Sequence, residues 1–85
     1  MMLSFHPQAW ADYLHWQQTD KAMLRRINNL IRDIQREPFE GIGKPEPLRF
    51  NFAGYWSRRI DEEHRIVYKI QDDEILIAQL RGHYD

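Results

Sequence analysis

No cysteine occurs anywhere in the chain, and this absence excludes disulfides, Cys-based zinc sites and thiolate nucleophiles. It also favours a cytoplasmic protein, because small secreted domains commonly depend on disulfides. Long apolar runs are missing too, since no segment approaches the roughly 20 residues of a membrane helix. The first ten residues lack the basic and apolar regions of a signal peptide. These absences predict a soluble protein with no membrane segment.

Net charge is also scarce, because 12 Lys and Arg against 13 Asp and Glu leave a formal charge of −1. This balance argues against a protein that binds nucleic acid through bulk electrostatics. The charge is uneven, however: the stretch from Lys44 to Arg59 contains four basic residues and one acid. The length of 85 residues, with 42% hydrophobic and 29% charged residues, predicts a single small domain over residues 1–85.

Several motifs of well-known sites are missing as well. The four histidines are not paired at metal-ligand spacing, and HExxH is absent, so we predict no metal and no other cofactor. The segment GIGKPEP lacks the GxxxxGK[ST] pattern, and its prolines remove backbone donors that a phosphate loop needs. No serine lies in a nucleophile elbow.

Two amphipathic helices are predicted in the first half of the chain. Met1–Phe5 is short and apolar and predicts a first strand, after which Pro7 suits the first turn of a helix over Gln8–Gln18. A clearer helix, Lys21–Arg36, follows Asp20, which is a good N-cap. Its apolar residues recur at steps of three and four and form one stripe: Met23, Ile27, Leu30, Ile31 and Ile34.

The loop Glu37–Pro47 connects this helix to the second half and is unusually stiff. It contains three of the four prolines and two of the four glycines, and prolines on both sides of Glu46 restrict its backbone. An ordinary connection is the simplest interpretation, but so stiff a loop also positions a side chain well. We predict that a strand, Leu48–Phe52, and a turn at Ala53–Gly54 follow it.

Three further strands are predicted over Tyr55–Ile60, Arg65–Ile70 and Glu74–Arg81, because apolar and polar residues alternate along them. The alternation predicts one apolar face, made of Ile66, Tyr68, Ile70, Leu76, Ala78 and Leu80. The opposite face then carries Arg65, Val67, Lys69, Gln79, Arg81 and His83. The apolar face needs a cover, which the helices provide. We therefore predict an α+β fold with two N-terminal helices on one face of a mainly antiparallel, twisted four- to five-stranded sheet.

The pairing of the first two of these strands depends on the length of the turn between them. A three-residue turn places Arg59 beside Arg65, whereas a two- or four-residue turn places Arg58 there instead. We favour Arg59, because Trp56 and Ile60 then point toward the core.

The remaining polar residues suggest a chemistry. A glutamate in a stiff loop, arginines on a sheet and a histidine near the end of the chain suit RNA cleavage without metal. The glutamate can take the proton of the 2′-hydroxyl, an arginine can stabilise the phosphorane, and the histidine can protonate the leaving 5′-oxygen. The residues alone leave a second interpretation open, in which these side chains are the solvated face of an antiparallel sheet.

Several stretches resemble the YoeB toxins, a branch of the RelE/ParE-like superfamily, over nearly the whole chain. They are GKPEPLRFNFAGYWSRRIDEEHRIVYKI, the terminal RGHY, WADYLHWQQTDK and REPFEG. The resemblance implies the toxin of a type II toxin–antitoxin system, an endoribonuclease that cuts mRNA on the ribosome and so inhibits translation. It also implies a RelE-like, microbial-ribonuclease-like fold and a YefM-like antitoxin as partner. Relatives suggest a homodimer.

The resemblance further implies roles for individual residues. Glu46 in KPEPL matches the general base of the family, Arg65 in EEHRIVY matches the arginine that stabilises the transition state, and His83 matches the general acid. Supporting or RNA- and ribosome-binding roles fall to Tyr84, Arg59, Arg49 and, more weakly, Glu63. Position 49 is often lysine in relatives, which keeps the charge but not the geometry. The additional Asp85 departs from the family pattern, and its carboxylate would favour the protonated form of His83.

A rival interpretation is a non-catalytic partner-binding module of the same fold, whose basic surface docks an acidic peptide. The joint presence of Glu46, Arg65 and His83 favours the enzyme.

Overall fold

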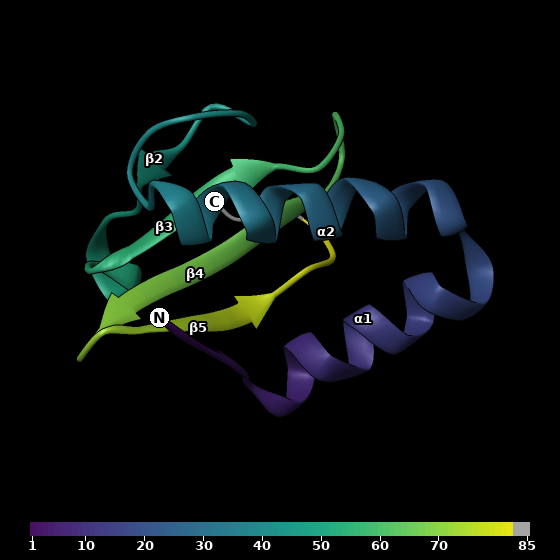
Figure 1. The fold of residues 1–85 in the computed structure, drawn as a ribbon, viewed down its shortest axis with the longest axis horizontal. Coiled ribbons are helices and arrows are strands. Elements are labelled where there is room, and N and C mark those ends of the chain that lie inside the picture. Colours follow the sequence, from purple (N-terminus) through teal and green to yellow (C-terminus); the bar gives the residue numbers. More distant parts are fainter. Residues whose placement is uncertain (83–85) are drawn as a thin grey trace.

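The computed structural model describes residues 1–82 and arranges them in two layers, with both helices on one face of a sheet (Figure 1). The elements in chain order are β1 (Met2–Phe5), α1 (Pro7–Thr19), α2 (Lys21–Arg36), β2 (Glu46–Pro47), the 3₁₀ turn η1 (Phe50–Phe52), β3 (Tyr55–Arg59), β4 (Arg65–Gln71) and β5 (Glu74–Gln79). The sheet order is β1-β5-β4-β3-β2, in which only the β1–β5 pair is parallel. The predicted α+β architecture is confirmed.

The ends of α2 follow from local chemistry. The Asp20 side chain accepts hydrogen bonds from the backbone N–H groups of Ala22 and Met23, which have no partner within the helix. The helix ends at Arg36, since Pro38 disfavours helical backbone at the residue before it. Within residues 1–82, neither helix combines the length and apolarity needed to cross a membrane.

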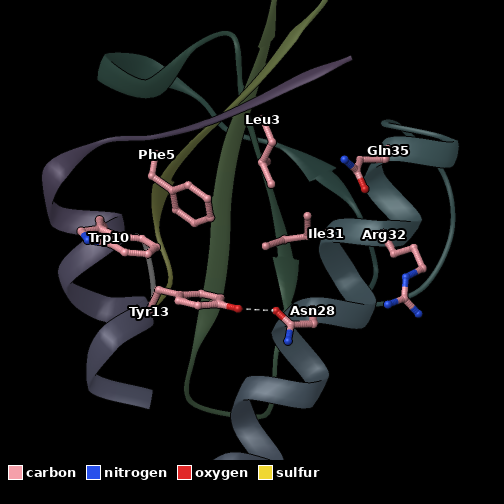
Figure 2. A pocket seen from close by; sticks show the side chains of 8 residues that line it. All are labelled: Leu3, Phe5, Trp10, Tyr13, Asn28, Ile31, Arg32 and Gln35. Carbon is pink, nitrogen blue, oxygen red and sulfur yellow. Dashed lines mark hydrogen bonds between the residues drawn. The ribbon is translucent and has the colours of Figure 1, made fainter. Parts of the chain in front are cut away.

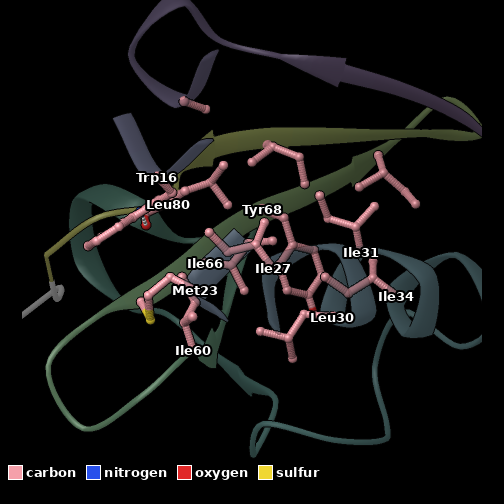
Figure 3. Close-up of a cluster of buried hydrophobic side chains, with 13 residues drawn as sticks. Trp16, Met23, Ile27, Leu30, Ile31, Ile34, Ile60, Ile66, Tyr68 and Leu80 are labelled. Atoms are coloured by element: carbon pink, nitrogen blue, oxygen red, sulfur yellow. Dashed lines mark hydrogen bonds between the residues drawn. The ribbon is translucent and has the colours of Figure 1, made fainter. Parts of the chain in front are cut away.

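The hydrophobic core lies between α2 and the sheet (Figure 3). The five stripe residues of α2 are buried, and Ile27 and Ile34 are completely inaccessible to solvent. Ile66, Tyr68 and Leu80 pack against them, as the alternation predicted. Burial of this apolar surface is the main favourable contribution to folding.

The predicted core positions in β5 are wrong by one residue. Ile75 and Ile77 are fully buried, whereas Leu76 and Ala78 are only partly buried. A β-bulge causes the difference: Tyr68 pairs with Ile77, but the preceding Val67 pairs with Gln79, so one residue of β5 is left without a partner. The bulge reverses the alternation, and Leu80 therefore reaches the same face as Ile77.

The predicted strand Leu48–Phe52 is also wrong. Only Glu46–Pro47 pairs with β3, followed by a single hydrogen bond from Leu48 N to the Tyr55 carbonyl at 2.9 Å. The chain then turns, because Phe50 adopts a φ of 58°, which no strand accommodates. Phe50 is 91% exposed and η1 replaces the strand.

A buried arginine fastens the loop before β2 to the rest of the fold. The side chain of Arg58 is fully buried, and its Nη1 contacts Asp33 Oδ2 at 2.6 Å. Its other donors reach the carbonyls of Glu37, Glu40 and Ile42 and the hydroxyl of Tyr68, at 2.7 to 3.1 Å. Since Tyr68 in turn donates to the Pro38 carbonyl, these contacts fix the path of the segment that leads to Glu46.

Gly41 allows this close approach. It has a φ of 128°, and a Cβ at this position would lie 2.0 Å from Asp33 Oδ2. The loop therefore needs glycine here, both for its backbone conformation and for the room that the carboxylate occupies.

The burial of Leu30 can be tested by shortening its side chain. We expect Leu30→Ala to lower the free energy of unfolding by ~2–5 kcal/mol, because the site is 4% exposed and a cavity would remain. Urea denaturation measures the change. Leu14→Ala, at a leucine that is 36% exposed, is the matched control and should cost less. A loss well under about 1 kcal/mol for Leu30→Ala would show that the stripe faces solvent.

The Asp33 carboxylate should make stability depend on pH. Hydrogen bonds from Arg36, Arg58 and the backbone of Ile42 lower the pKa of Asp33 to about 2. Its contribution is therefore complete above the unfolded pKa near 3.8 and is lost as the pH falls through the folded value. We expect the difference in urea midpoint between the wild type and Asp33→Asn to be constant above pH 5 and to shrink from pH 4 to pH 2. The exposed Glu62, changed to Gln, is the control; a difference that does not shrink contradicts the ionic role of Asp33.

Candidate functional site

The sheet face opposite the helices brings together three of the seven predicted site residues. Arg59 pairs directly with Arg65, which confirms the register that we favoured. Glu46 pairs with Ser57, two residues before Arg59 on β3, so Glu46, Arg59 and Arg65 share this face. Arg58 lies on the other face and is fully buried. A turn of the right length, between β3 and β4, thus decides which arginine faces outward.

The distance between Glu46 and Arg65 follows from the geometry of the sheet. One strand, β3, separates them, and the pair is offset by two residues along the strands. With strand spacings of 4.7–4.9 Å and a rise of about 3.4 Å per residue, their Cα atoms lie on the order of 12 Å apart. Two long side chains directed at one phosphate group can bridge this span.

Arg65 is anchored through one terminal nitrogen of its guanidinium group. Its Nη1 lies 3.1 Å from the Asp61 carbonyl and 3.3 Å from the His64 carbonyl, so the side chain is anchored to the turn before β4. Among residues 1–82, its Nε and Nη2 have no hydrogen-bond partner. As far as residues 1–82 are concerned, both donors are available for an anion.

Asp61 shapes that turn. Its carboxylate accepts hydrogen bonds from the backbone N–H of Glu63 at 2.9 Å and of His64 at 2.7 Å. Burial opposes ionisation of this group, but the two hydrogen bonds, together with nearby positive charge such as that of Arg26, outweigh the burial and lower the pKa of Asp61. The turn is thus fixed by a charged side chain at the pH of the cell.

Two further predicted residues lie at opposite ends of this face. Arg49 follows β2, level with the residue before Tyr55 in the register of β2 and β3, and so lies about five residues, or ~17 Å, along the strand from Arg59. Glu63 is exposed in the turn before β4, with its Oε1 3.8 Å from His64 Nε2. The structure therefore does not gather Arg49 beside Glu46 and Arg65, whereas Glu63 lies in the turn that holds the Arg65 side chain.

The predicted general acid His83, its neighbour Tyr84 and Asp85 lie outside the described residues. The last described residue is Gly82, whose carbonyl accepts a hydrogen bond from Arg65 N at 2.8 Å and whose N–H donates to His64 Nδ1 at 2.8 Å. The residue before His83 is thus fastened directly to the first residue of β4.

Sequence reasoning missed the buried polar residues that hold this end of β5. Asp12 is 3% exposed and accepts from Leu80 N at 3.0 Å, while Trp16 Nε1 donates to the Leu80 carbonyl at 2.9 Å. A signal was present: Asp12 falls at helical spacing between the buried Ala9 and Trp16, so a charge interrupts the apolar stripe of α1.

A hollow of about 400 Å³ lies on the helix side between β1 and the two helices (Figure 2). Three aromatic rings border it: Trp10 stacks on Tyr13 with centroids 5.6 Å apart, and Phe5 meets both rings edge-on. Tyr13 donates a hydrogen bond to Asn28 at 2.9 Å. Trp10 is 48% exposed, so this surface suits binding rather than proton transfer.

Known proteins resemble the chain throughout. A model of the YoeB-like toxins of bacterial type II toxin–antitoxin systems matches residues 5–84. The toxin YoeB of Escherichia coli K12 is 57% identical over 84 residues, which cover 99% of this chain and all of that protein. A solved YoeB/ParE toxin from Agrobacterium tumefaciens superposes with a TM-score of 0.97 at 49% identity, covering 99% of this chain and 100% of that one.

The YoeB of Staphylococcus aureus has been solved in a complex with YefM and as a dimer. Its TM-scores to this structure are 0.91 and 0.92, at 48% and 49% identity, over 99% of this chain and 98% of each solved chain. Fold and sequence agree over the same residues. The chain therefore belongs to the YoeB-like toxin family of bacterial type II toxin–antitoxin systems.

Proposed function

We propose that this toxin is a ribosome-dependent endoribonuclease that cleaves mRNA without a metal ion and so inhibits translation in the cytoplasm. Glu46 is the general base, Arg65 stabilises the transition state and His83 is the general acid. The observation that carries the proposal is the sheet face that Glu46 and Arg65 share, together with the hydrogen bond from Arg65 N to Gly82, the residue before His83.

The three residues divide one reaction between them. The Glu46 carboxylate takes the proton of a 2′-hydroxyl, and the resulting oxygen attacks the adjacent phosphorus. Arg65 balances the negative charge that accumulates on the phosphorane oxygens. His83 gives a proton to the departing 5′-oxygen. The bond to the 5′-oxygen breaks as the 2′ bond forms, leaving a 2′,3′-cyclic phosphate and a free 5′-hydroxyl.

The pairing of Arg59 with Arg65 supports an anionic substrate. Two like charges directly opposite each other on neighbouring strands destabilise a sheet. A phosphate between the two guanidinium groups would remove that repulsion and form charge-assisted hydrogen bonds with both. Arg49 is too far away to share this phosphate and is proposed to contact RNA further along the strand or on the ribosome. Tyr84 supports His83 or the bound RNA, and Glu63 joins the polar surroundings of the turn.

Dependence on the ribosome agrees with the charge of the chain. A formal charge of −1 provides little general attraction for RNA, so a binding partner must supply the affinity for mRNA and its orientation. The ribosome supplies both in this proposal.

We also propose a YefM-like antitoxin as partner and a homodimer, because the Staphylococcus aureus relative has been solved in both assemblies. An acidic, partly disordered antitoxin would meet the basic face through charge complementarity, which speeds encounter. Ordering of the antitoxin on binding would offset part of the interaction energy.

The chemistry can be tested by changing the general acid. We expect His83→Gln to lower mRNA cleavage on purified ribosomes by ~10²–10⁴-fold with ribosome binding nearly unchanged, because only proton donation is lost. His6→Gln, at an exposed histidine before α1, is the control. The wild-type products should end in a 2′,3′-cyclic phosphate or 3′-phosphate and begin with a 5′-hydroxyl. A 5′-phosphate on the downstream fragment would mean that water attacked the phosphorus, and the assignment of Glu46, Arg65 and His83 would fail.

The antitoxin surface can be tested by removing charge from it. Arg59→Gln and Arg65→Gln should slow association with a YefM-like antitoxin and weaken its dependence on salt, as measured by stopped-flow fluorescence from 50 to 500 mM NaCl. Arg25→Gln, on the exposed side of α2, is the matched control and should change neither quantity. An unchanged rate and salt dependence in the sheet variants would place the antitoxin elsewhere.

A further inference from the structure

The segment that leads from β5 to His83 is held by side chains from other parts of the fold. Leu80 is bonded at both backbone groups, its N–H to Asp12 and its carbonyl to Trp16. Gly82 is likewise bonded at both groups, its carbonyl to the backbone of Arg65 and its N–H to the His64 side chain. These four hydrogen bonds, at 2.8 to 3.0 Å, form what we call the β5 clamp.

His64 and Asp12 both accept a hydrogen bond in the β5 clamp through an atom that can also bind a proton, and His64 is the one that does so through an imidazole nitrogen. Its Nδ1 lies 2.8 Å from Gly82 N and accepts the hydrogen bond, so the proton of the neutral ring belongs on Nε2. A second proton, on Nδ1, would turn the acceptor into a donor and set two N–H groups against each other. Histidine is also the side chain that ordinarily changes charge between pH 5 and 8.

The surroundings of His64 hold the ring in place without sealing it from solvent. Its side chain is 15% exposed and packs edge-on against Trp16, with centroids 4.9 Å apart; the His15 ring lies on Trp16 in turn. The charged groups nearby are of both signs. The Glu63 carboxylate lies 3.8 Å from Nε2, and the Asp61 carboxylate accepts a hydrogen bond from the His64 backbone N–H. The Arg65 side chain contacts the His64 carbonyl. Asp12 and Arg81 line a surface hollow together with His64.

We propose that His64 is a positioning residue: its neutral ring holds the segment leading to His83, and protonation of Nδ1 releases that segment. The effect on cleavage rests on the proposed role of His83, whereas the β5 clamp itself does not. Cleavage would then require a proton on His83 and none on His64 Nδ1. Activity therefore falls on the acid side for a reason separate from protonation of Glu46.

The β5 clamp is tested first without any RNA. Nuclear magnetic resonance of the ¹⁵N-labelled chain from pH 8 to pH 5 follows the His64 ring nitrogens and the Gly82 amide. We expect an unprotonated Nδ1 at pH 8, and loss of Gly82 exchange protection at the same midpoint as His64 protonation. In His64→Asn, Oδ1 replaces Nδ1 as acceptor but cannot titrate, so Gly82 should stay protected throughout. His6→Asn should behave as the wild type. A Gly82 amide that stays protected while His64 of the wild type titrates would overturn the proposal.

Cleavage on ribosomes then tests the consequence. At pH 7.5 we expect His64→Leu to lower kcat by about 10–100-fold with little change in KM, since a small displacement of a catalytic group has effects of this size. We expect His64→Asn to retain activity within about 3-fold and to extend the acid limb of the pH profile to lower pH. An unchanged acid limb in His64→Asn overturns the proposal, even if His64→Leu fails to fold. If the wild type binds ribosomes but does not cleave RNA, the proposed function is refuted. The magnetic resonance experiment then still shows whether protonation of His64 releases Gly82.

Discussion

The ion pair between the buried guanidinium of Arg58 and Asp33 is the contact on which the sheet face of Glu46, Arg59 and Arg65 depends most. Removing a charged group from water costs several kcal/mol unless a counter-ion and further acceptors replace its hydration. Asp33 supplies the counter-charge, and the carbonyls of Glu37, Glu40 and Ile42 supply acceptors. The guanidinium therefore stays buried only while the loop follows one path. That path ends at Glu46, so a core contact on the helix side sets the position of a candidate base on the opposite side.

Side chains of α1 hold the end of β5 in a similar way. Asp12 and Trp16 hold Leu80, and His64 holds Gly82, so the segment before His83 is bonded to elements far from it in sequence. Among residues 1–82, no buried side-chain nitrogen or oxygen lacks a hydrogen-bond partner. Buried polar networks of this completeness make a structure rigid, because each displaced group would leave another unsatisfied. The helices thus both cover the core and position the two segments that carry the proposed base and acid.

Much of the fold could be predicted because its signals are local. The apolar stripe and the Asp20 cap predicted α2 correctly, and alternation predicted β3 and β4 together with the pairing of Arg59 and Arg65. Two predictions failed where one residue departs from the regular pattern. Phe50, at a φ of 58°, ends the pairing that a strand at Leu48–Phe52 would need, and the bulge in β5 moves the core to Ile75 and Ile77. Neither a positive φ nor a bulge alters composition or period strongly enough to be seen in one sequence.

The two helices, the alternating strands and the motifs that identify the family could all be predicted from the amino-acid order, because each depends on residues a few positions apart. The amino-acid order also placed Arg65 at the start of a strand, whereas Glu46, predicted in a stiff loop, lies in the short strand β2. Only the tertiary structure decided that Arg58 is buried, that Asp12 faces Leu80, and that His64 accepts a hydrogen bond from Gly82. These partners are 25, 68 and 18 residues apart in sequence for Arg58–Asp33, Asp12–Leu80 and His64–Gly82. Contacts over such separations depend on how the helices dock on the sheet, and no local propensity encodes that docking.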